Sequence, residues 1–282
     1  VVSSRQAADA LGGNGLREDD KSHLVRRRLA RLAGVPERNL RLFASGMAAI
    51  NSVLRGLPGM RDGLKTLQVE FPYVDSLKVQ EEFGNGVVFL NQAVGESFDE
   101  ALARIRNGGF AGVFTEVPSN PLLRTASIPP LARACGEGGV PLVIDDSAAG
   151  PGNTALLEYA DVVTTSLTKW ASGHGDVMAG MAVLRGDSPF AGELAAALDE
   201  DAREGSPLYV ADQEVLLDNL RGVKRRMARV NANGLALAGW LSGHPAVAEV
   251  YHPSCSTREN YDRVRASDGG YGGLLSFVLK QA

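Results

Sequence analysis

Lys169 is the residue of this sequence whose type and neighbours most directly suggest chemistry. It follows an apolar run that ends at Ser166, and Thr168 stands directly before it. A lysine in a cleft can lose its proton and become an amine nucleophile, and two nearby hydroxyl groups can bind a phosphate. The alternative is a solvent-exposed lysine after a turn. We interpret His174 as a turn or packing residue rather than a metal ligand.

The segment Ser45-Gly46-Met47 predicts the beginning of a helix, with Ser45 as its N-cap. The free backbone N–H groups of Gly46 and Met47 lie at the positive end of the helix dipole, an arrangement that suits a phosphate. Many helices that bind no ligand begin in the same way. A purely structural cap is therefore the alternative.

Two further apolar runs end in polar residues. Asp145 and Asp146 end one of them, where a carboxylate can hold a buried cation or cap a helix. Asn120, between Pro118 and Pro121, can bind a ring oxygen or begin a turn. A lysine for a Schiff base, an acid for a pyridinium nitrogen and a phosphate cradle are together what pyridoxal phosphate requires. The sequence therefore predicts a pyridoxal phosphate site and no metal site.

The elements that position these residues follow an α/β pattern. Over the first two thirds of the chain, short apolar runs alternate with amphipathic stretches, which predicts a mostly parallel sheet. Ligands bind beyond the carboxyl ends of such strands, and the candidate residues fall there. The predicted strands are residues 66–71, 87–90, 112–117, 141–145, 161–166 and 180–184, and a helical stripe runs through Met47, Ile50, Val53, Leu54 and Leu57.

The pattern changes after residue 207. Residues 209–241 are helical almost without a break, and residues 247–251 and 272–279 predict two strands around a polar loop. We therefore predict an N-terminal arm (residues 1–19), a large cofactor-binding domain (20–220) and a small C-terminal α/β domain (221–282). Because the last strand signal runs to the end of the chain, we expect this small domain to be incomplete.

Composition narrows the class of protein. The chain has 282 residues, 44% hydrophobic and 22% charged, with a formal net charge of −4. These values exclude a miniprotein and argue against a disordered chain or a basic nucleic-acid scaffold. Two cysteines and no apolar run of about 18 residues lead us to expect a cytoplasmic protein without nucleic-acid or membrane partners. We interpret residues 12–15, which are rich in glycine, as a loop rather than a nucleotide site.

The order and spacing of these motifs resemble the Cys/Met-metabolism family of pyridoxal phosphate enzymes, over nearly the whole chain. The resemblance implies an aspartate-aminotransferase-like type I fold and a homo-oligomer, a dimer or tetramer with shared active sites. Three segments look most like the fungal-type cystathionine γ-synthase branch and its bacterial relatives. The matching segments are Ser45 to Met47, Glu116 to Pro121, Ile144-Asp145, Ser166 to Lys169, Ser172 to His174 and Gly272 to Phe277, and the branch-like ones are Phe71 to Lys78, Val117 to Leu123 and Tyr271 to Leu274.

Roles for single residues follow from this resemblance. It implies that Lys169 forms the Schiff base with the cofactor and that Asp145 partners the pyridine nitrogen. It implies that Asn120 lies beside the ring hydroxyl and that Tyr73 stacks on the ring as an acid/base. The residues implied to hold the phosphate are Gly46, Met47, Ser166 and Thr168.

Arg5 is implied to bind the phosphate of a neighbouring subunit. Ser4-Arg5 is similar to the end of the family's Tyr-x-Arg motif, although Ser3 stands in place of the tyrosine. The family's arginine for the substrate carboxylate would fall after Ala282, and family segments would also precede Val1. We therefore expect a chain that is truncated at both ends.

The resemblance implies a transferase of sulfur amino-acid metabolism. The expected reaction is γ-replacement on an activated homoserine with cysteine, which makes cystathionine. A γ-lyase or a homoserine sulfhydrylase of the same family is the alternative. A different class, a non-catalytic fragment that binds pyridoxal phosphate, also stays open because of the expected truncation.

Overall fold

The computed structural model describes residues 2–13 and 20–281. Asn14 and Gly15 of the glycine-rich stretch lie outside the described residues, as does most of the second half of the predicted N-terminal arm. The first half of that arm forms helix α1 (Ser4–Leu11), with Ser3 as its N-cap. None of the helices within the described ranges is long and apolar enough to cross a membrane.

A seven-stranded sheet forms the centre of the molecule, in the order β1-β7-β6-β5-β4-β2-β3. β7 runs antiparallel to both of its neighbours, and the pairs from β6 to β3 are parallel. The fold is thus α/β with a mostly parallel sheet, as the alternating pattern predicts. The strands are β1 (Leu40–Phe43), β2 (Thr66–Val69), β3 (Val87–Leu90), β4 (Val113–Glu116), β5 (Leu142–Asp145), β6 (Val162–Ser166) and β7 (Gly180–Leu184).

Most strand bounds agree with the sequence pattern, and β3 and β7 match it to the residue. The pattern did not predict β1, a four-residue strand that contains Arg41. This strand depends on its pairing with β7, where Phe43 lies opposite Gly180. Arg41 interrupts the apolar run that marks the other strands, so the local pattern carries little signal for β1.

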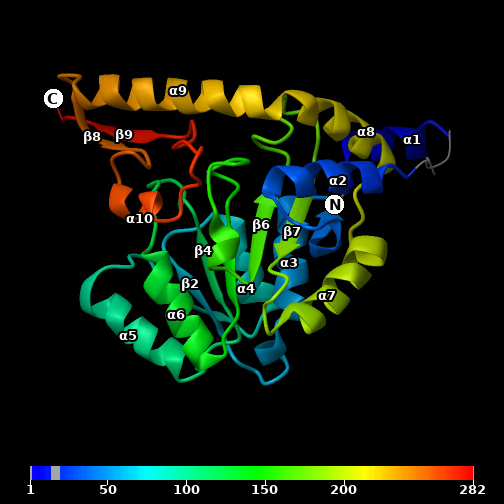
Figure 1. The fold of residues 1–282 in the computed structure, drawn as a ribbon, viewed down its shortest axis with the longest axis horizontal. Coiled ribbons are helices and arrows are strands. Elements are labelled where there is room, and N and C mark those ends of the chain that lie inside the picture. The colour runs from blue at the N-terminus through cyan, green and yellow to red at the C-terminus, as the bar shows by residue number, and fades with distance from the viewer. Residues whose placement is uncertain (1, 14–19, 282) are drawn as a thin grey trace.

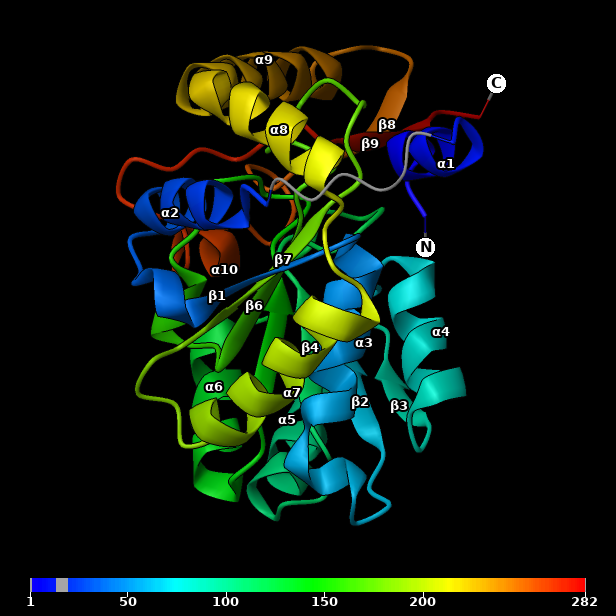
Figure 2. The same cartoon turned by 90° about the vertical axis from the view of Figure 1, so that its right-hand side faces the viewer.

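Helices cover both faces of the sheet. One face packs on α3 (Gly46–Gly56) and α7 (Ala191–Glu200), and the other packs on α5 (Gly95–Arg106), α6 (Ile128–Gly138) and α2 (Ser22–Ala33). Figure 2 shows the sheet between α6 on one side and α3 and α4 (Val74–Phe83) on the other. Short helical turns complete this part of the chain: η1 (Glu37–Asn39), η2 (Pro58–Met60), η3 (Leu156–Glu158) and η4 (Asp201–Gly205).

The predicted long helix after residue 207 has a break. It comprises α8 (Val210–Asn219), the 3₁₀ turn η5 (Leu220–Gly222) and α9 (Val223–Ser242), and α9 extends across one end of the molecule (Figure 1). β8 (Val247–Tyr251) pairs with β9 (Ser276–Leu279), and α10 (Arg258–Asp262) lies between them in sequence. The last strand is therefore shorter than the predicted 272–279. The division into domains at residue 221 stays a prediction.

Candidate active site

The candidate residues on three neighbouring strands face the same helix. Side chains alternate between the faces of a strand. Val143 on β5 packs in the core beneath α3, whereas Leu142 and Ile144 pack in the core beneath α5 and α6. By this alternation Asp145 points to the α3 face. The same alternation places Glu116 of β4 and Thr164 and Ser166 of β6 on that face.

Asp145 is held by two donors. Its Oδ1 accepts the backbone N–H of Ser147 at 2.9 Å, and its Oδ2 accepts the hydroxyl of Thr164 at 2.8 Å. Burial raises the pKa of this carboxyl, and these hydrogen bonds oppose the rise. A cation placed beside Asp145 would favour its ionised form further. The site therefore suits a protonated ring nitrogen.

Glu116 is a second buried carboxyl at this edge, opposite Asp145 in the strand register. Its Oε1 accepts the backbone N–H of Tyr73 at 2.7 Å. Burial first, and then the charge of Asp145, raise the pKa of Glu116 well above its usual range. Glu116 thus links Tyr73, at the N-terminus of α4, to the strand end that carries Asp145.

The predicted phosphate cradle comes together from two segments that are distant in sequence. Ser45 caps α3 by accepting the N–H of Ala48 at 3.1 Å. The first N–H groups of the helix, on Gly46 and Met47, have no intrahelical acceptor because no helical turn precedes them. A Cβ added at Gly46 would lie 2.8 Å from the Cβ of Ser166. The beginning of α3 therefore lies directly against the end of β6, and a glycine is needed there.

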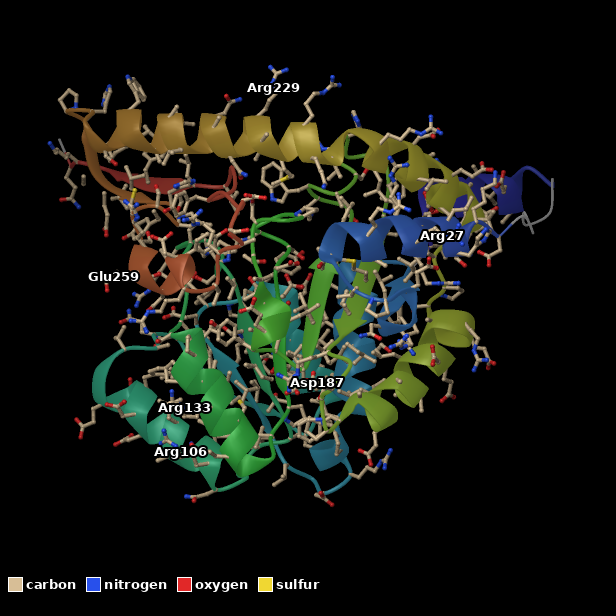
Figure 3. The ribbon with its side chains drawn as sticks, viewed as in Figure 1. Arg27, Arg106, Arg133, Asp187, Arg229 and Glu259 are labelled. Atoms are coloured by element: carbon tan, nitrogen blue, oxygen red, sulfur yellow. The ribbon has the colours of Figure 1, made fainter. Side chains whose placement is uncertain are left out.

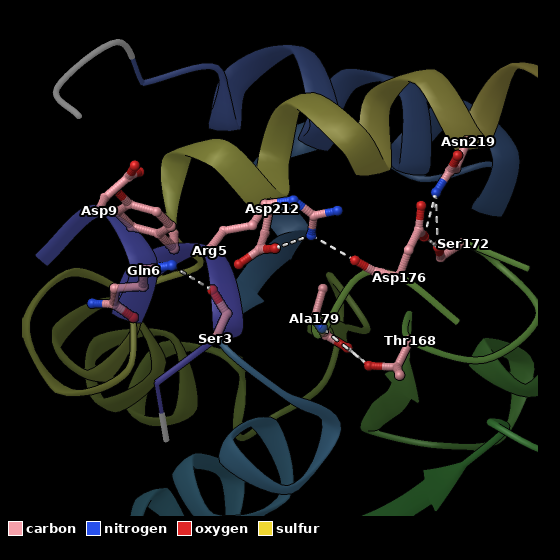
Figure 4. A network of polar contacts seen from close by, with 11 residues as sticks. Ser3, Arg5, Gln6, Asp9, Thr168, Ser172, Asp176, Ala179, Asp212 and Asn219 are labelled. Atoms are coloured by element: carbon pink, nitrogen blue, oxygen red, sulfur yellow. Dashed lines mark hydrogen bonds and ion pairs between the residues drawn. The ribbon is translucent and has the colours of Figure 1, made fainter. Parts of the chain in front are cut away.

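Lys169 stands in the turn that follows β6. Its side chain is exposed, and within the described part of the chain its ammonium group has neither a hydrogen bond nor an ion pair. Thr168 is differently placed, because its hydroxyl binds the backbone of Ala179 through an N–H at 3.1 Å and a carbonyl at 3.3 Å (Figure 4). The reaction of the Lys169 amine and the phosphate contact of Thr168 both stay predictions. His174 lies exposed in the loop beyond this turn.

Three further candidate residues lie around this edge. Tyr73 is half exposed, and a hydrogen bond to Asp75 raises the pKa of its hydroxyl. Asn120 lies in a turn after β4, between two cis peptide bonds. Arg5 on α1 pairs with Asp212 at 2.7 Å within the same chain (Figure 4). The structure thus gives Arg5 an intrachain partner, and its contact with a neighbouring subunit stays a prediction.

Sequence reasoning missed the residues that support Asp145. Thr164 and Ser147 each stand two residues from a candidate, Ser166 and Asp145 respectively. Residues two apart in a strand share a face, so the position of Thr164 two residues before Ser166 was the sequence signal that could have found it. For Glu116, the pattern indicated the segment but not the residue's contact with Tyr73, which joins β4 to the N-terminus of α4.

A family model matches residues 18–282, and its description is Cys/Met metabolism PLP-dependent enzyme. This match covers nearly the whole chain. The chain belongs to this family of pyridoxal phosphate enzymes. The residues at the sheet edge fit the cofactor: the Asp145 carboxyl is held in place by two donors, the turn that carries Lys169 directly follows Ser166, and the N–H groups at the beginning of α3 lie against that serine.

Relatives and solved structures agree with the family. The chain is 32% identical over 98% of its length to a cystathionine γ-synthase of Neurospora crassa, and 33% identical over 99% to an L-2-amino-4-chloropent-4-enoate dechlorinase/desaturase of Streptantibioticus cattleyicolor. It spans 45% and 56% of these two relatives, about half their length. The crystal structure of cystathionine γ-synthase from Xanthomonas oryzae with cystathionine matches with a TM-score of 0.76 at 27% identity, covering 94% of this chain and 69% of that one.

Proposed function

We propose that this chain contributes the cofactor site of a cystathionine γ-synthase-like transferase, which replaces the γ substituent of an activated homoserine with cysteine. The proposal is supported by the position of Asp145, Ser166 and the beginning of α3 at one edge of the sheet, with the turn that carries Lys169 directly after Ser166. The names of the relatives support the reaction class. Pyridoxal phosphate supplies an electron sink for the bonds of the substrate's α-carbon.

The proposed roles follow from the chemistry of each group. The ammonium group of Lys169 has no competing partner in the described residues, so its amine would hold the cofactor's aldehyde carbon and move a proton at the substrate Cα. Asp145, oriented by Thr164 and Ser147, would keep a proton on the ring nitrogen. Both residues lie where strands end, which is the general location of ligand sites in such sheets.

The remaining roles concern binding and orientation. The N–H groups of Gly46 and Met47 and the hydroxyl of Ser166 would bind the phosphate, and their contact across the sheet edge supports this. Thr168 would join them only if its hydroxyl leaves Ala179. The set is completed by residues that we propose from the family resemblance: Tyr73 over the ring, Asn120 beside its hydroxyl, and Arg5 toward a phosphate in a neighbouring subunit of a homo-oligomer.

The cofactor proposal is tested by the visible absorption of the protein with pyridoxal phosphate. We expect a yellow band that is lost in Lys169→Ala and kept in Lys78→Ala, a lysine on α4 that serves as a control. Borohydride reduction followed by peptide mass spectrometry should place the modification on Lys169. A band of equal strength in Lys169→Ala would contradict the assignment.

The reaction is tested with O-succinyl- or O-acetylhomoserine and cysteine. Cystathionine as the product supports the γ-synthase, whereas 2-oxobutyrate from cystathionine alone would favour a γ-lyase. Homocysteine formed with sulfide would favour a sulfhydrylase. A Lys169-dependent band without turnover of any of these substrates would favour a non-catalytic chain that binds the cofactor.

A further inference from the structure

Arg226, near the beginning of α9, contacts the turn that carries Lys169. Its Nε donates to the carbonyl of Trp170 at 3.2 Å, and its Nη2 donates to the carbonyl of Ala171 at 2.5 Å. Both carbonyls belong to the residues that directly follow Lys169. The same guanidinium also donates to the carbonyl of Asn219 at 3.4 Å, at the end of α8.

These contacts cap the end of a helical turn. Within the turn, the N–H of Ser172 bonds the carbonyl of Leu167 at 2.9 Å, and the N–H of Gly173 bonds the carbonyl of Lys169 at 2.8 Å. The carbonyls of Trp170 and Ala171, which follow Lys169 in the turn, carry partial negative charge and accept no hydrogen bond within the turn itself. A planar guanidinium can satisfy two such acceptors at once, which an ammonium group cannot do with the same geometry.

Gly173 has the backbone conformation, and the lack of a side chain, that the contact with Arg226 requires. Its φ is +74°, and a Cβ added there would collide with the guanidinium of Arg226. Gly175 has a similar φ of +69°, but a Cβ there would meet no atom within 4 Å. The two glycines therefore share the same backbone requirement, and only Gly173 also makes room for Arg226.

Among the residues that the structure describes, the guanidinium of Arg226 bonds backbone carbonyls and has no carboxylate partner. Partial burial lowers the pKa of the guanidinium, and its hydrogen bonds to the carbonyls offset the loss of hydration that burial brings. Asn219 holds the same loop at a second point, through Ser172 Oγ at 2.9 Å and Asp176 at 3.0 Å (Figure 4). Asn219 and Arg226, at the junction of α8 and α9, thus both form hydrogen bonds with the loop directly after Lys169.

We propose that Arg226 is a positioning residue for Lys169. It fixes the backbone directly after the lysine, which restricts the conformations of the turn from which the amine reaches the cofactor site. Because Arg226 belongs to α9, the same contact links the C-terminal part of the chain to the reactive amine. This inference rests on the proposed function of Lys169 as the amine that binds the cofactor.

The test separates the covalent bond from cofactor binding in general. Pyridoxal phosphate forms the Lys169-dependent band, whereas pyridoxamine phosphate has no aldehyde and reports only on the ring and phosphate contacts. In Arg226→Ala we expect about a tenfold weaker apparent affinity in the band titration, the size of one lost charged hydrogen bond. The affinity for pyridoxamine phosphate, measured by calorimetry, should change less than about twofold.

Matched variants control for charge and for folding. Arg229→Ala removes the same charge from α9, where the side chain points away from the body of the molecule (Figure 3), and it should behave as the unmodified chain. The apparent affinity of Arg226→Lys for pyridoxal phosphate should lie between that of Arg226→Ala and that of the unmodified chain. If Arg226→Ala does not fold, Gly173→Ala against Gly175→Ala asks the same question, because only the first displaces the guanidinium.

The two affinities of Arg226→Ala distinguish a positioning role of Arg226 from a purely structural role and from no role. Equal losses of affinity for both ligands in Arg226→Ala would mean a merely structural role, and no loss for either would mean no role. Either result overturns the positioning of Lys169 while leaving its chemistry intact. Absence of a Lys169-dependent band in the unmodified chain would instead refute the proposed function, and the positioning inference with it.

Discussion

Thr164 and Asp145 face each other across two neighbouring strands, and the threonine hydroxyl donates to Asp145 Oδ2 at 2.8 Å. The next residue along each segment repeats this arrangement: Thr165 of β6 points to the opposite face and donates to Asp146, the residue directly after β5, at 2.5 Å. The chain therefore holds two threonine–aspartate pairs of the same chemistry. Only the first faces α3 and the candidate cofactor site.

This duplication gives a matched pair of variants. Thr164→Val removes a donor to Asp145 while keeping the side chain's shape, so it disfavours the ionised carboxyl. We expect affinity for pyridoxal phosphate to fall about tenfold, as read from titration of the visible band. Thr165→Val, on the other face, should bind the cofactor as the unmodified chain does. Equal losses in both variants would contradict the assignment of faces.

Asp145→Asn tests the charge itself. The amide keeps the shape of the side chain but cannot hold a proton on the ring nitrogen by charge. We expect the Lys169-dependent band to form, with the turnover of an activated homoserine reduced by about 10²-fold or more. Steady-state kinetics on the active protein measure this loss. Unchanged turnover would assign the nitrogen partner to another group.

Gly46→Ala tests the contact between α3 and β6. The new Cβ would lie 2.8 Å from the Cβ of Ser166, so the helix end must shift, at a cost of about 1–3 kcal/mol in the free energy of unfolding. Gly136→Ala in α6 is the control, since a Cβ there meets no atom within 4 Å and alanine favours a helix. Urea unfolding should show Gly46→Ala destabilised and Gly136→Ala slightly stabilised.

Gly46→Ala should also weaken the binding of inorganic phosphate, because the N–H groups at the start of α3 would move away from Ser166. Calorimetry can measure this affinity directly. Phosphate binding equal to that of Gly136→Ala would count against the cradle at the beginning of α3.

Asp146 gives a prediction about pH. Burial raises the pKa of its carboxyl to about 7, from an ordinary value of 3.8. Between these two pH values the folded chain keeps a proton that the unfolded chain has lost, so stability falls as pH rises through this range and levels off above it. Asp146→Asn removes this fall. From pH 4 to pH 8 it should gain up to about 4 kcal/mol relative to the unmodified chain.

The control for this prediction is Asp62→Asn, which removes an exposed carboxyl and should leave the pH dependence unchanged. Urea unfolding at several pH values measures both variants. The same pH slope in Asp146→Asn as in the unmodified chain would show that the carboxyl ionises normally in the folded state.

Several features of the fold were predictable because they depend on neighbours in the chain. The bounds of β3 and β7 and the N-cap of α3 follow from apolar runs and from Ser45. The break at η5 and the strand β1 were not predictable in this way. Both depend on packing against distant segments, as in the pairing of Phe43 with Gly180.

The sequence by itself determined which residues can do the chemistry, because a lysine, an aspartate and a helix start after apolar runs are local signals. It also determined the family, through the order of those motifs. Only the tertiary structure decided that Asp145 rather than Asp146 faces α3, that Gly46 abuts Ser166, and that the Thr168 hydroxyl is engaged by Ala179. It likewise brought Arg226 to the turn after Lys169. These contacts join segments far apart in sequence, and their geometry depends on how strands pair and helices pack, which no local pattern encodes.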